Sequence, residues 1–140
     1  DRAVRANGSH GGPVSAPSLR EKPMSASFLS FDISGIEPEH DAPAADRLIS
    51  GNPRFTTWNL EETEGGTLFA GVWESTPGKW RIMYDEWEYC TIVSGRSVIT
   101  EDNGPAVTVS AGDSFVLRPG FKGSWDVIEA TRKQYVIKLP

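Results

Sequence analysis

A tyrosine, two glutamates and a cysteine occupy alternate positions in one stretch of the chain, at Tyr84, Glu86, Glu88 and Cys90. Successive side chains of a β-strand point to opposite faces, so in an uninterrupted strand these four share one side with Ile82. A phenol and a carboxylate that face the same space can exchange protons with a bound molecule. The pattern therefore predicts Tyr84 and Glu88 as candidate catalytic residues, with Glu86 as a candidate substrate-binding residue.

Each of these residues also has a purely structural interpretation. A buried carboxylate is costly unless it is paired, so Glu88 needs a ligand, a shifted pKa or a hydrogen bond from a tyrosine, a tryptophan or the backbone. Tyr84 could equally fill space in the core. No histidine lies near Cys90 in the sequence to activate its thiol, so an inert buried cysteine is the favoured interpretation.

Two tryptophans and a lysine complete the candidate substrate-binding set. Trp80 and Trp125 could form the walls of a pocket, because indole faces attract cationic groups, although aromatic residues in strands are more often ordinary core. Lys133 could bind a carboxylate of a substrate. The alternative, which the sequence favours, is a solvated lysine at the edge of a strand.

Short runs rich in aromatic and β-branched residues follow one another from Arg54 onward, and turn signals separate them. The predicted strands are RFTTWNLE, TLFAGVWES, WRIMY, EYCTIV, RSVITE, AVTVS, SFVLR, GSWDVIEA and KQYVIKL. The gaps between them are too short for a crossover helix, so the sheet is predicted to be antiparallel. Closing such a sheet limits its exposed edges, which predicts an all-β fold with a single antiparallel β-barrel or jelly roll.

The N-terminal part of the chain differs in composition from the rest. Residues 1–27 are rich in Gly, Ser, Ala and Pro, which predicts a flexible arm, and the GSHGG stretch within it is typical of an expression tag. Residues 28–140 are predicted to form the single barrel, with FLSFDI as a short strand followed by a loop that contains at most one helical turn. The arm and the apolar FLSFDI segment favour pairing with a second copy, so we expect a homodimer.

Composition argues against several classes of protein. The net charge is −5 and lysine and arginine are scattered singly, which leaves no basic patch for nucleic acid. No apolar stretch reaches the ~18 to 20 residues that cross a bilayer, and the first residues do not resemble a secretory signal. The single cysteine cannot form an intrachain disulfide. These features predict a cytoplasmic protein with no nucleic-acid or membrane partner.

Two segments resemble the signature motifs of the cupin superfamily. The first motif ends with a glutamate, six residues and a glycine, which matches Glu88 and Gly95. The second runs glycine, five residues, proline, one residue, glycine, two residues and histidine. Gly112 and Gly120 match it, whereas Arg118 stands in the proline place and Gly123 in the histidine place. In the same order, TPGKW, DEWEYCTIVSG, AGDSFVLRPGFKGSW and RKQYVIKL resemble small single-barrel cupins similar to ureidoglycine aminohydrolase and to an ethanolamine-utilisation protein.

The resemblance covers about residues 54–140 and implies a cupin, or RmlC-like, jelly roll. In that family the motifs carry three metal-binding histidines, whose places here are taken by Ile82, Tyr84 and Gly123. Only Glu88 remains of the usual ligand set, and one carboxylate holds a transition metal weakly. We therefore expect no metal cofactor, beyond weak binding of a divalent ion through Glu88.

The resemblance also implies that the barrel interior is the place for a ligand. The leading hypothesis is a metal-independent cupin that performs acid–base chemistry on a small polar metabolite containing nitrogen or a carboxylate. The alternatives are a non-catalytic small-molecule-binding domain and a structural dimer whose barrel is filled with side chains. Whether the barrel holds a cavity separates the last alternative from the other two.

Overall fold

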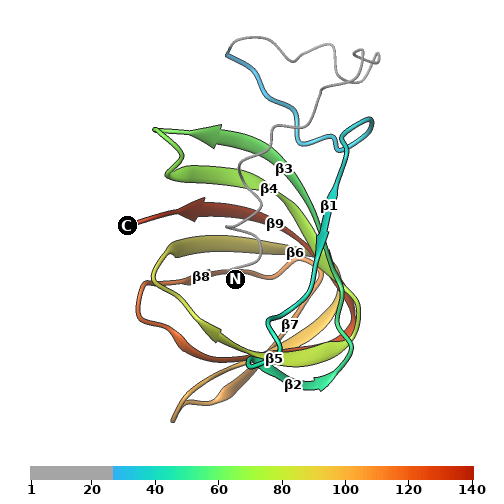
Figure 1. The fold of residues 1–140 in the computed structure, drawn as a ribbon, viewed down its shortest axis with the longest axis vertical. Coiled ribbons are helices and arrows are strands. Elements are labelled where there is room, and N and C mark those ends of the chain that lie inside the picture. The colour runs from blue at the N-terminus through green and yellow to red at the C-terminus, as the bar shows by residue number, and fades with distance from the viewer. Residues whose placement is uncertain (1–26) are drawn as a thin grey trace.

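Nine β-strands make up the part of the protein that the computed structural model describes, residues 27–140, and this part contains no helix (Figure 1). The strands are β1 (Glu39–Asp41), β2 (Leu48–Gly51), β3 (Phe55–Thr63), β4 (Leu68–Ser75), β5 (Gly78–Met83), β6 (Trp87–Glu101), β7 (Ala106–Ser110), β8 (Ser114–Leu117) and β9 (Lys122–Lys138). All of their pairings are antiparallel. The predicted all-β antiparallel fold is therefore confirmed. Within the described residues there is accordingly no helix that could span a membrane.

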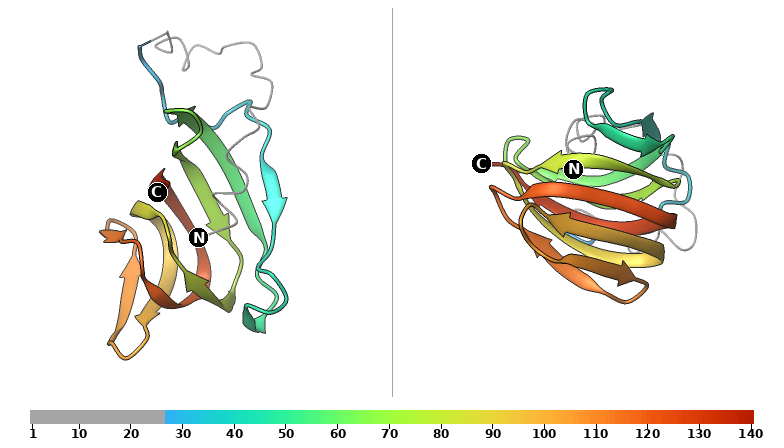
Figure 2. Two further views of the ribbon diagram at one scale, coloured as in Figure 1. Left: turned by 60° about the vertical axis from the view of Figure 1, so that its left-hand side comes forward. Right: turned by 90° about the horizontal axis from the view of Figure 1, so that it is seen from below.

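Two long strands, β6 and β9, pass through both halves of the structure and hold them together. In one half, the C-terminal part of β9 lies between β4 and the N-terminal part of β6, and β3, β1 and β8 extend the sheet. In the other half, the N-terminal part of β9 lies between β5 and the C-terminal part of β6, with β2 and β7 at the edges. The sheet therefore curls into an open half-barrel of the jelly-roll kind, as the two views in Figure 2 show.

Both long strands continue through points where the sequence predicts a break. A turn is predicted at Ser94 and Gly95, but β6 runs through it with shifts of register between Ile92 and Arg96. Gly95 has a φ of 89°, and a Cβ added to it would lie 2.0 Å from the carbonyl oxygen of Ala130. A glycine at a β-bulge bends a strand without ending it, so the turn signal marks the point where β6 changes sheet. The predicted strands GSWDVIEA and KQYVIKL are likewise one strand, β9.

The prediction is least accurate for residues 28–53. FLSFDI is not a strand. Its backbone is irregular, and its one strand-like feature is an isolated bridge at Phe28. The stretch predicted as a loop contains β1 and β2, which pair with β3 and β5. These two strands are too short to show the apolar alternation from which a strand is predicted. The single helical turn is present as a hydrogen-bonded turn, in which the N–H groups of Arg47 and Leu48 donate to the carbonyl oxygen of Ala44 at 2.8 and 3.1 Å.

Residues 1–26 lie outside the described part of the chain, so the predicted arm at residues 1–27 stays a prediction.

Aromatic rings fill the space that the curled sheet encloses. The ring centroids of Trp73 and Trp125 are 5.6 Å apart in an edge-to-face arrangement, and neither side chain is exposed. Trp80 stacks on Trp125 with 6.4 Å between centroids and 8° between planes, and Phe55 packs against Trp73 at 5.3 Å. Each such ring removes roughly 150–250 Å² from water, so these four side chains account for a large share of the hydrophobic stabilisation of a small barrel.

We expect Gly71→Ala to destabilise the protein by about 1–3 kcal/mol, because the centre of the sheet has no room for a methyl group. A Cβ at this position of β4 would lie 2.2 Å from the carbonyl oxygen of Trp58 and 2.7 Å from the hydroxyl oxygen of Tyr135. Gly104→Ala is the matched control, since its nearest non-neighbouring atom would be 3.4 Å away. Urea unfolding measures both variants, and equal stabilities would contradict the close approach of β3 and β9 to Gly71.

Candidate functional site

A phenol, a carboxylate and an ammonium meet inside the half-barrel. The hydroxyl of Tyr84 donates a hydrogen bond of 2.5 Å to Oε1 of Glu88. The Nζ atom of Lys133 lies 2.9 Å from Oε2 of the same carboxylate. Glu88 and Lys133 have no exposed surface, and Tyr84 is 3% exposed. The sequence predicted Tyr84 and Glu88 together and Lys133 separately, and the structure joins all three into one polar cluster.

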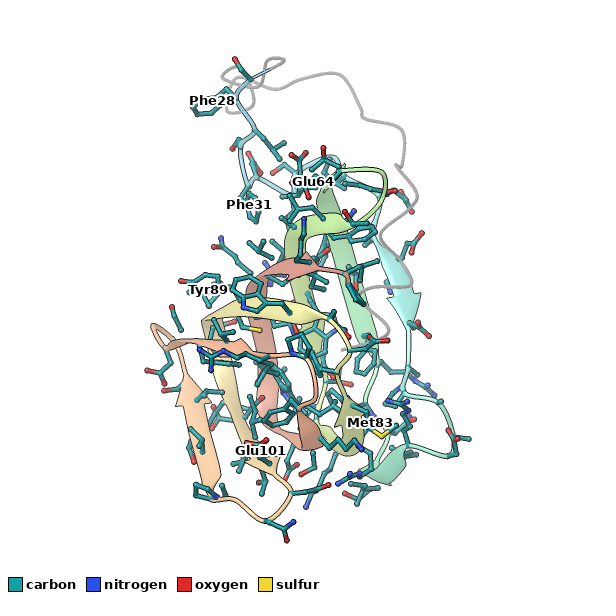
Figure 3. All side chains as sticks on the ribbon, turned by 90° about the vertical axis from the view of Figure 1, so that its left-hand side faces the viewer. Phe28, Phe31, Glu64, Met83, Tyr89 and Glu101 are labelled. Carbon is teal, nitrogen blue, oxygen red and sulfur yellow. The ribbon has the colours of Figure 1, made fainter. Side chains whose placement is uncertain are left out.

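The four residues predicted to share one side do face the interior, although no single strand runs through them, since β5 ends at Met83 and β6 begins at Trp87. Tyr84, Glu86, Glu88 and Cys90 are all buried. Their neighbours in the sequence face outward, including Met83 and Tyr89, whose side chains point away from the barrel in Figure 3. Tyr84 follows the end of β5, and two backbone hydrogen bonds hold it to the loop before β9. Its N–H donates to the carbonyl of Phe121 at 2.8 Å, and its carbonyl accepts from the N–H of Gly120 at 2.7 Å.

The burial of Lys133 corrects the interpretation that the sequence favoured. A solvated lysine at a strand edge was expected, but β9 lies in the middle of the sheet between β4 and β6. Lys133 stands opposite Trp73 on β4 and Ile92 on β6, and both of these side chains are buried. A lysine in this setting loses its water, so it needs the carboxylate of Glu88 to remain charged.

Two indole rings flank the ammonium of Lys133. Its Nζ atom lies 4.5 Å from the ring centroid of Trp73 and 4.5 Å from that of Trp125. Trp80, predicted together with Trp125, is one ring further away, and it packs against both Trp125 and Trp73, at 6.4 and 6.2 Å between ring centroids. Trp73 was not among the predicted site residues. Its position on the buried face of the apolar run TLFAGVWES was the available signal, but core packing explains such a residue equally well.

The other two candidates in this stretch are buried beside the cluster. Oε1 of Glu86 accepts a hydrogen bond of 3.1 Å from the backbone N–H of Asp85. Cys90 is fully buried, and burial raises the pKa of its thiol far above the ordinary value. A thiol that stays protonated is a poor nucleophile, which agrees with the predicted inert cysteine.

Burial and charge together fix the protonation states of the cluster. Burial raises the pKa of Tyr84 well above its ordinary value, and the charge of Glu88 raises it further. Burial alone would raise the pKa of Glu88, but the ammonium of Lys133 and the hydrogen bond from Tyr84 help to lower it below its ordinary value. Burial alone would lower the pKa of Lys133, which the surrounding acidic groups instead raise. Because the thiol of Cys90 is neutral, the carboxylate of Glu88 is the charge that keeps Lys133 protonated.

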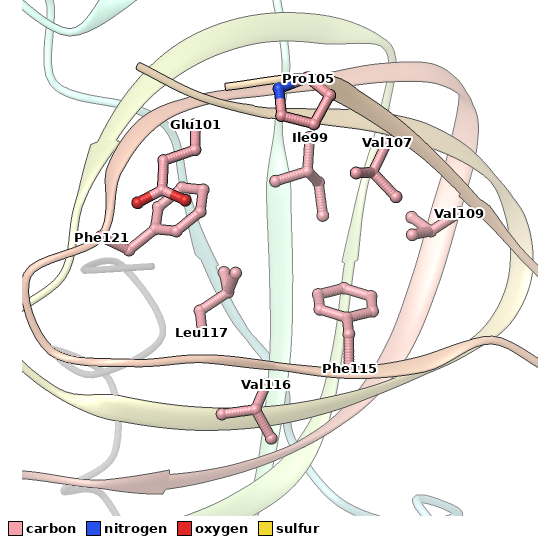
Figure 4. A pocket seen from close by; sticks show the side chains of 9 residues that line it. All are labelled: Ile99, Glu101, Pro105, Val107, Val109, Phe115, Val116, Leu117 and Phe121. Carbon is pink, nitrogen blue, oxygen red and sulfur yellow. The ribbon is translucent and has the colours of Figure 1, made fainter. Parts of the chain in front are cut away.

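A pocket of about 230 Å³ opens between the edge strands β7 and β8, next to the polar cluster (Figure 4). The side chains that line it are Ile99, Glu101, Pro105, Val107, Val109, Phe115, Val116, Leu117 and Phe121. Its inner wall touches the interior, since Phe121 packs edge-on against Tyr84 at 6.3 Å and Phe115 packs against Trp125 at 6.1 Å. This pocket could not be predicted from local sequence patterns, because β7 and β8 pair with β6 and not with each other.

Comparison with known families assigns the fold. The sequence profile of the EutQ-like cupin domain matches residues 62–135. The chain belongs to this family. The predicted cupin resemblance is thereby confirmed, whereas the comparison with curated proteins yields no significant match.

Solved structures of other cupins agree with this assignment. A DUF861-family protein of unknown function from Pseudomonas syringae has 29% identity and a TM-score of 0.69, with 77% of this chain matched to 46% of that one. The chain therefore spans about half the length of that protein. The EutQ protein of Clostridium difficile has 24% identity and a TM-score of 0.56, with coverages of 71% and 80%. Ectoine synthase from P. lautus has 18% identity and a TM-score of 0.56, with coverages of 67% and 70%, which supports the fold alone.

The metal ion that the cupin motifs imply does not fit the side chains of this cupin. Ile82 offers no donor atom, Tyr84 is already bonded to Glu88, and the ammonium of Lys133 stands where it would repel a cation. Gly123 cannot be a histidine without movement of the backbone, because its Cβ would lie 2.0 Å from the carbonyl oxygen of Thr100. The described residues contain no group of three or more His, Cys, Asp and Glu side chains that could hold a metal.

We expect Lys133→Met to reverse the dependence of stability on acid pH. In the wild type the lowered pKa of Glu88 contributes stability above the ordinary carboxyl pKa, and this contribution is lost as the pH falls through the folded-state value. Without the ammonium, burial raises that pKa, so the variant is most stable in acid and weakens as the pH rises through the raised value. At neutral pH the loss should be about 3–5 kcal/mol, as for other broken buried ion pairs.

Urea unfolding between about pH 4 and pH 8 measures this effect. The control is the double variant Glu88→Gln/Lys133→Met, which lacks the titrating carboxylate and should show neither slope. A Lys133→Met protein with the wild-type slope would mean that another group keeps Glu88 ionised.

Restoring the motif histidine with Gly123→His should destabilise the protein without creating a metal site. The new side chain would collide with the backbone of β6 near Thr100, whereas Lys122→His changes the neighbouring exposed residue and serves as the control. Thermal unfolding and elemental analysis of the purified variants measure the two effects. Stoichiometric zinc, nickel or iron in the Gly123→His protein would show that the site can still be assembled.

Proposed function

We propose that this cupin is a metal-independent binding domain that takes a small molecule into the pocket between β7 and β8. The observation that carries the proposal is the pocket itself, about 230 Å³ of apolar space at the open side of the half-barrel. Small-molecule sites are typically concave and mostly apolar with few polar groups, and drug-sized ligands use ~300–1,000 Å³. The volume lies below this range, so the pocket suits a molecule smaller than a typical drug.

The lining of the pocket indicates the chemistry of that ligand. Phe115, Phe121 and Val109 offer an apolar surface, and Glu101 is the one charged side chain among the described residues that line it. A carboxylate attracts a cation and repels an anion. An amine with an apolar body fits these groups best. Of the two ligand classes predicted from the sequence, the nitrogen-containing one is therefore favoured over the carboxylate-bearing one.

The polar cluster supports binding better than acid–base catalysis. Both carboxylate oxygens of Glu88 face donors from the protein itself, Tyr84 and Lys133. The raised pKa of Tyr84 and the lowered pKa of Glu88 make the phenol a weak acid and the carboxylate a weak base at neutral pH. A general acid or base works best when its pKa lies near the working pH, and both groups are shifted away from it.

Catalysis by Tyr84 and Glu88 is a second candidate function, and one observation favours it. The indole N–H groups of Trp73 and Trp125 are buried and have no hydrogen-bond partner within residues 27–140. Buried donors usually find an acceptor, and acceptor atoms of a substrate inside the barrel would supply one.

The homodimer also stays a prediction. It would cover the exposed apolar side chains of Phe28 and Phe31.

Benzylamine and benzyl alcohol are suitable probes of the proposed pocket, because they share an aromatic body and differ in charge. We expect ligand-detected NMR to show that benzylamine binds more tightly, and that Glu101→Gln removes this preference. Val107→Trp should fill the pocket and abolish binding of both probes. Val93→Trp is the matched control, since Val93 is a similarly exposed valine outside the pocket. Binding that survives Val107→Trp would refute this site, and turnover of an amine that is lost in Tyr84→Phe would favour the catalytic candidate.

A further inference from the structure

The ammonium of Lys133 lies in a box with three distinct walls. The carboxylate of Glu88 forms one wall, 2.9 Å from Nζ, and the rings of Trp73 and Trp125 form the other two, each with its centroid 4.5 Å from Nζ. Tyr84 closes the far side of the carboxylate through its 2.5 Å hydrogen bond. Aromatic faces combined with a carboxylate are the means by which proteins recognise alkylammonium groups, because ring faces attract a cation that has lost its water.

The surrounding structure holds the two aromatic walls of this box in place without help from Lys133. Trp125 is braced by the parallel ring of Trp80 and by Phe115, at centroid distances of 6.4 and 6.1 Å. Trp73 is braced by Phe55 at 5.3 Å and stands edge-on to Trp125. A site whose walls are fixed in advance binds without the cost of ordering them. The box should therefore keep its shape when its occupant is removed.

We propose that Glu88, Tyr84, Trp73 and Trp125 form a binding site for a primary alkylammonium group, and that Lys133 is its tethered occupant. The site contains Glu88, the one residue that remains of the metal-binding motif, and it differs from the pocket between β7 and β8. A primary ammonium suits it because it donates to the carboxylate and presents its charge to both rings. A transition metal is a poor fit, because the site offers it one carboxylate and two indole ring faces that carry no donor atoms.

The experiment separates the occupant from its tether. Lys133→Ala removes three methylene groups and the ammonium, and together these correspond to n-propylammonium. We expect n-propylammonium chloride to raise the Tm of this variant by about 5 °C at a concentration of ten times its Kd. Sodium chloride and n-propanol at the same concentrations should give no such rise, and the wild type should show none with any of the three.

The controls decide whether the charge is recognised. If n-propanol stabilises Lys133→Ala as well as n-propylammonium does, the cavity recognises hydrocarbon alone and the proposal is wrong. The variant Glu88→Gln/Lys133→Ala has the same cavity without the negative charge, so n-propylammonium should lose its advantage over n-propanol there. Equal rescue of both variants by n-propylammonium would also overturn the proposal.

A measurement on the wild-type protein covers the case in which Lys133→Ala does not fold. NMR of protein with ¹⁵N-labelled lysine should show one ammonium signal whose protons exchange slowly and are shifted upfield by two indole rings. This signal should be absent from Lys133→Met and moved in Trp125→Phe. If every lysine ammonium exchanges at the rate of a solvent-exposed group, Lys133 is not held in the box and the proposal fails.

Discussion

A carboxylate in the interior of a small barrel cannot remain charged without a cation beside it, and this constraint organises the centre of the structure. Moving an ion out of water costs several kcal/mol even after the protein relaxes, and only close pairing with further hydrogen bonds offsets the cost. For Glu88 on β6, this cost is offset by the ion pair with Lys133 on β9 and by the hydrogen bond from Tyr84 after the end of β5. The cluster thus fixes the position of β9 relative to the junction of β5 and β6, which lies about 45 residues earlier in the sequence.

The same cluster shows how much of the site could be predicted from the sequence. Alternation predicted that Tyr84, Glu86 and Glu88 share one side if the strand is uninterrupted, and they do so although the chain bends between β5 and β6. It could also have identified Lys133, because this residue alternates with the buried Tyr135 and Ile137 in the run KQYVIKL. What the sequence could not supply is the order of the strands. Only the pairing of β9 with both β4 and β6 takes Lys133 from an edge to the centre.

Long-range geometry also limits what could be predicted of the fold. Most of the strands from residue 54 onward were predictable, since each carries its own apolar pattern and turn residues. Gly95 misled the prediction because a glycine with positive φ occurs both at tight turns and at bulges, and only the neighbouring strand tells the two apart. The pocket lay beyond any local pattern. It depends on the gap between β7 and β8, which are edge strands of different halves of the barrel.

An ammonium in place of a metal changes what the interior of this cupin can do. A metal ion offers open coordination positions to a substrate, whereas a lysine surrounded by a carboxylate and two rings uses its charge within the protein. The pocket does not depend on that charge, because Phe115 and Phe121 stand between it and the cluster, in contact with Trp125 and Tyr84. The binding that we propose for the pocket is therefore compatible with a centre in which the ammonium has a structural role. This division reconciles a cupin fold with a motif from which the metal-binding histidines are missing.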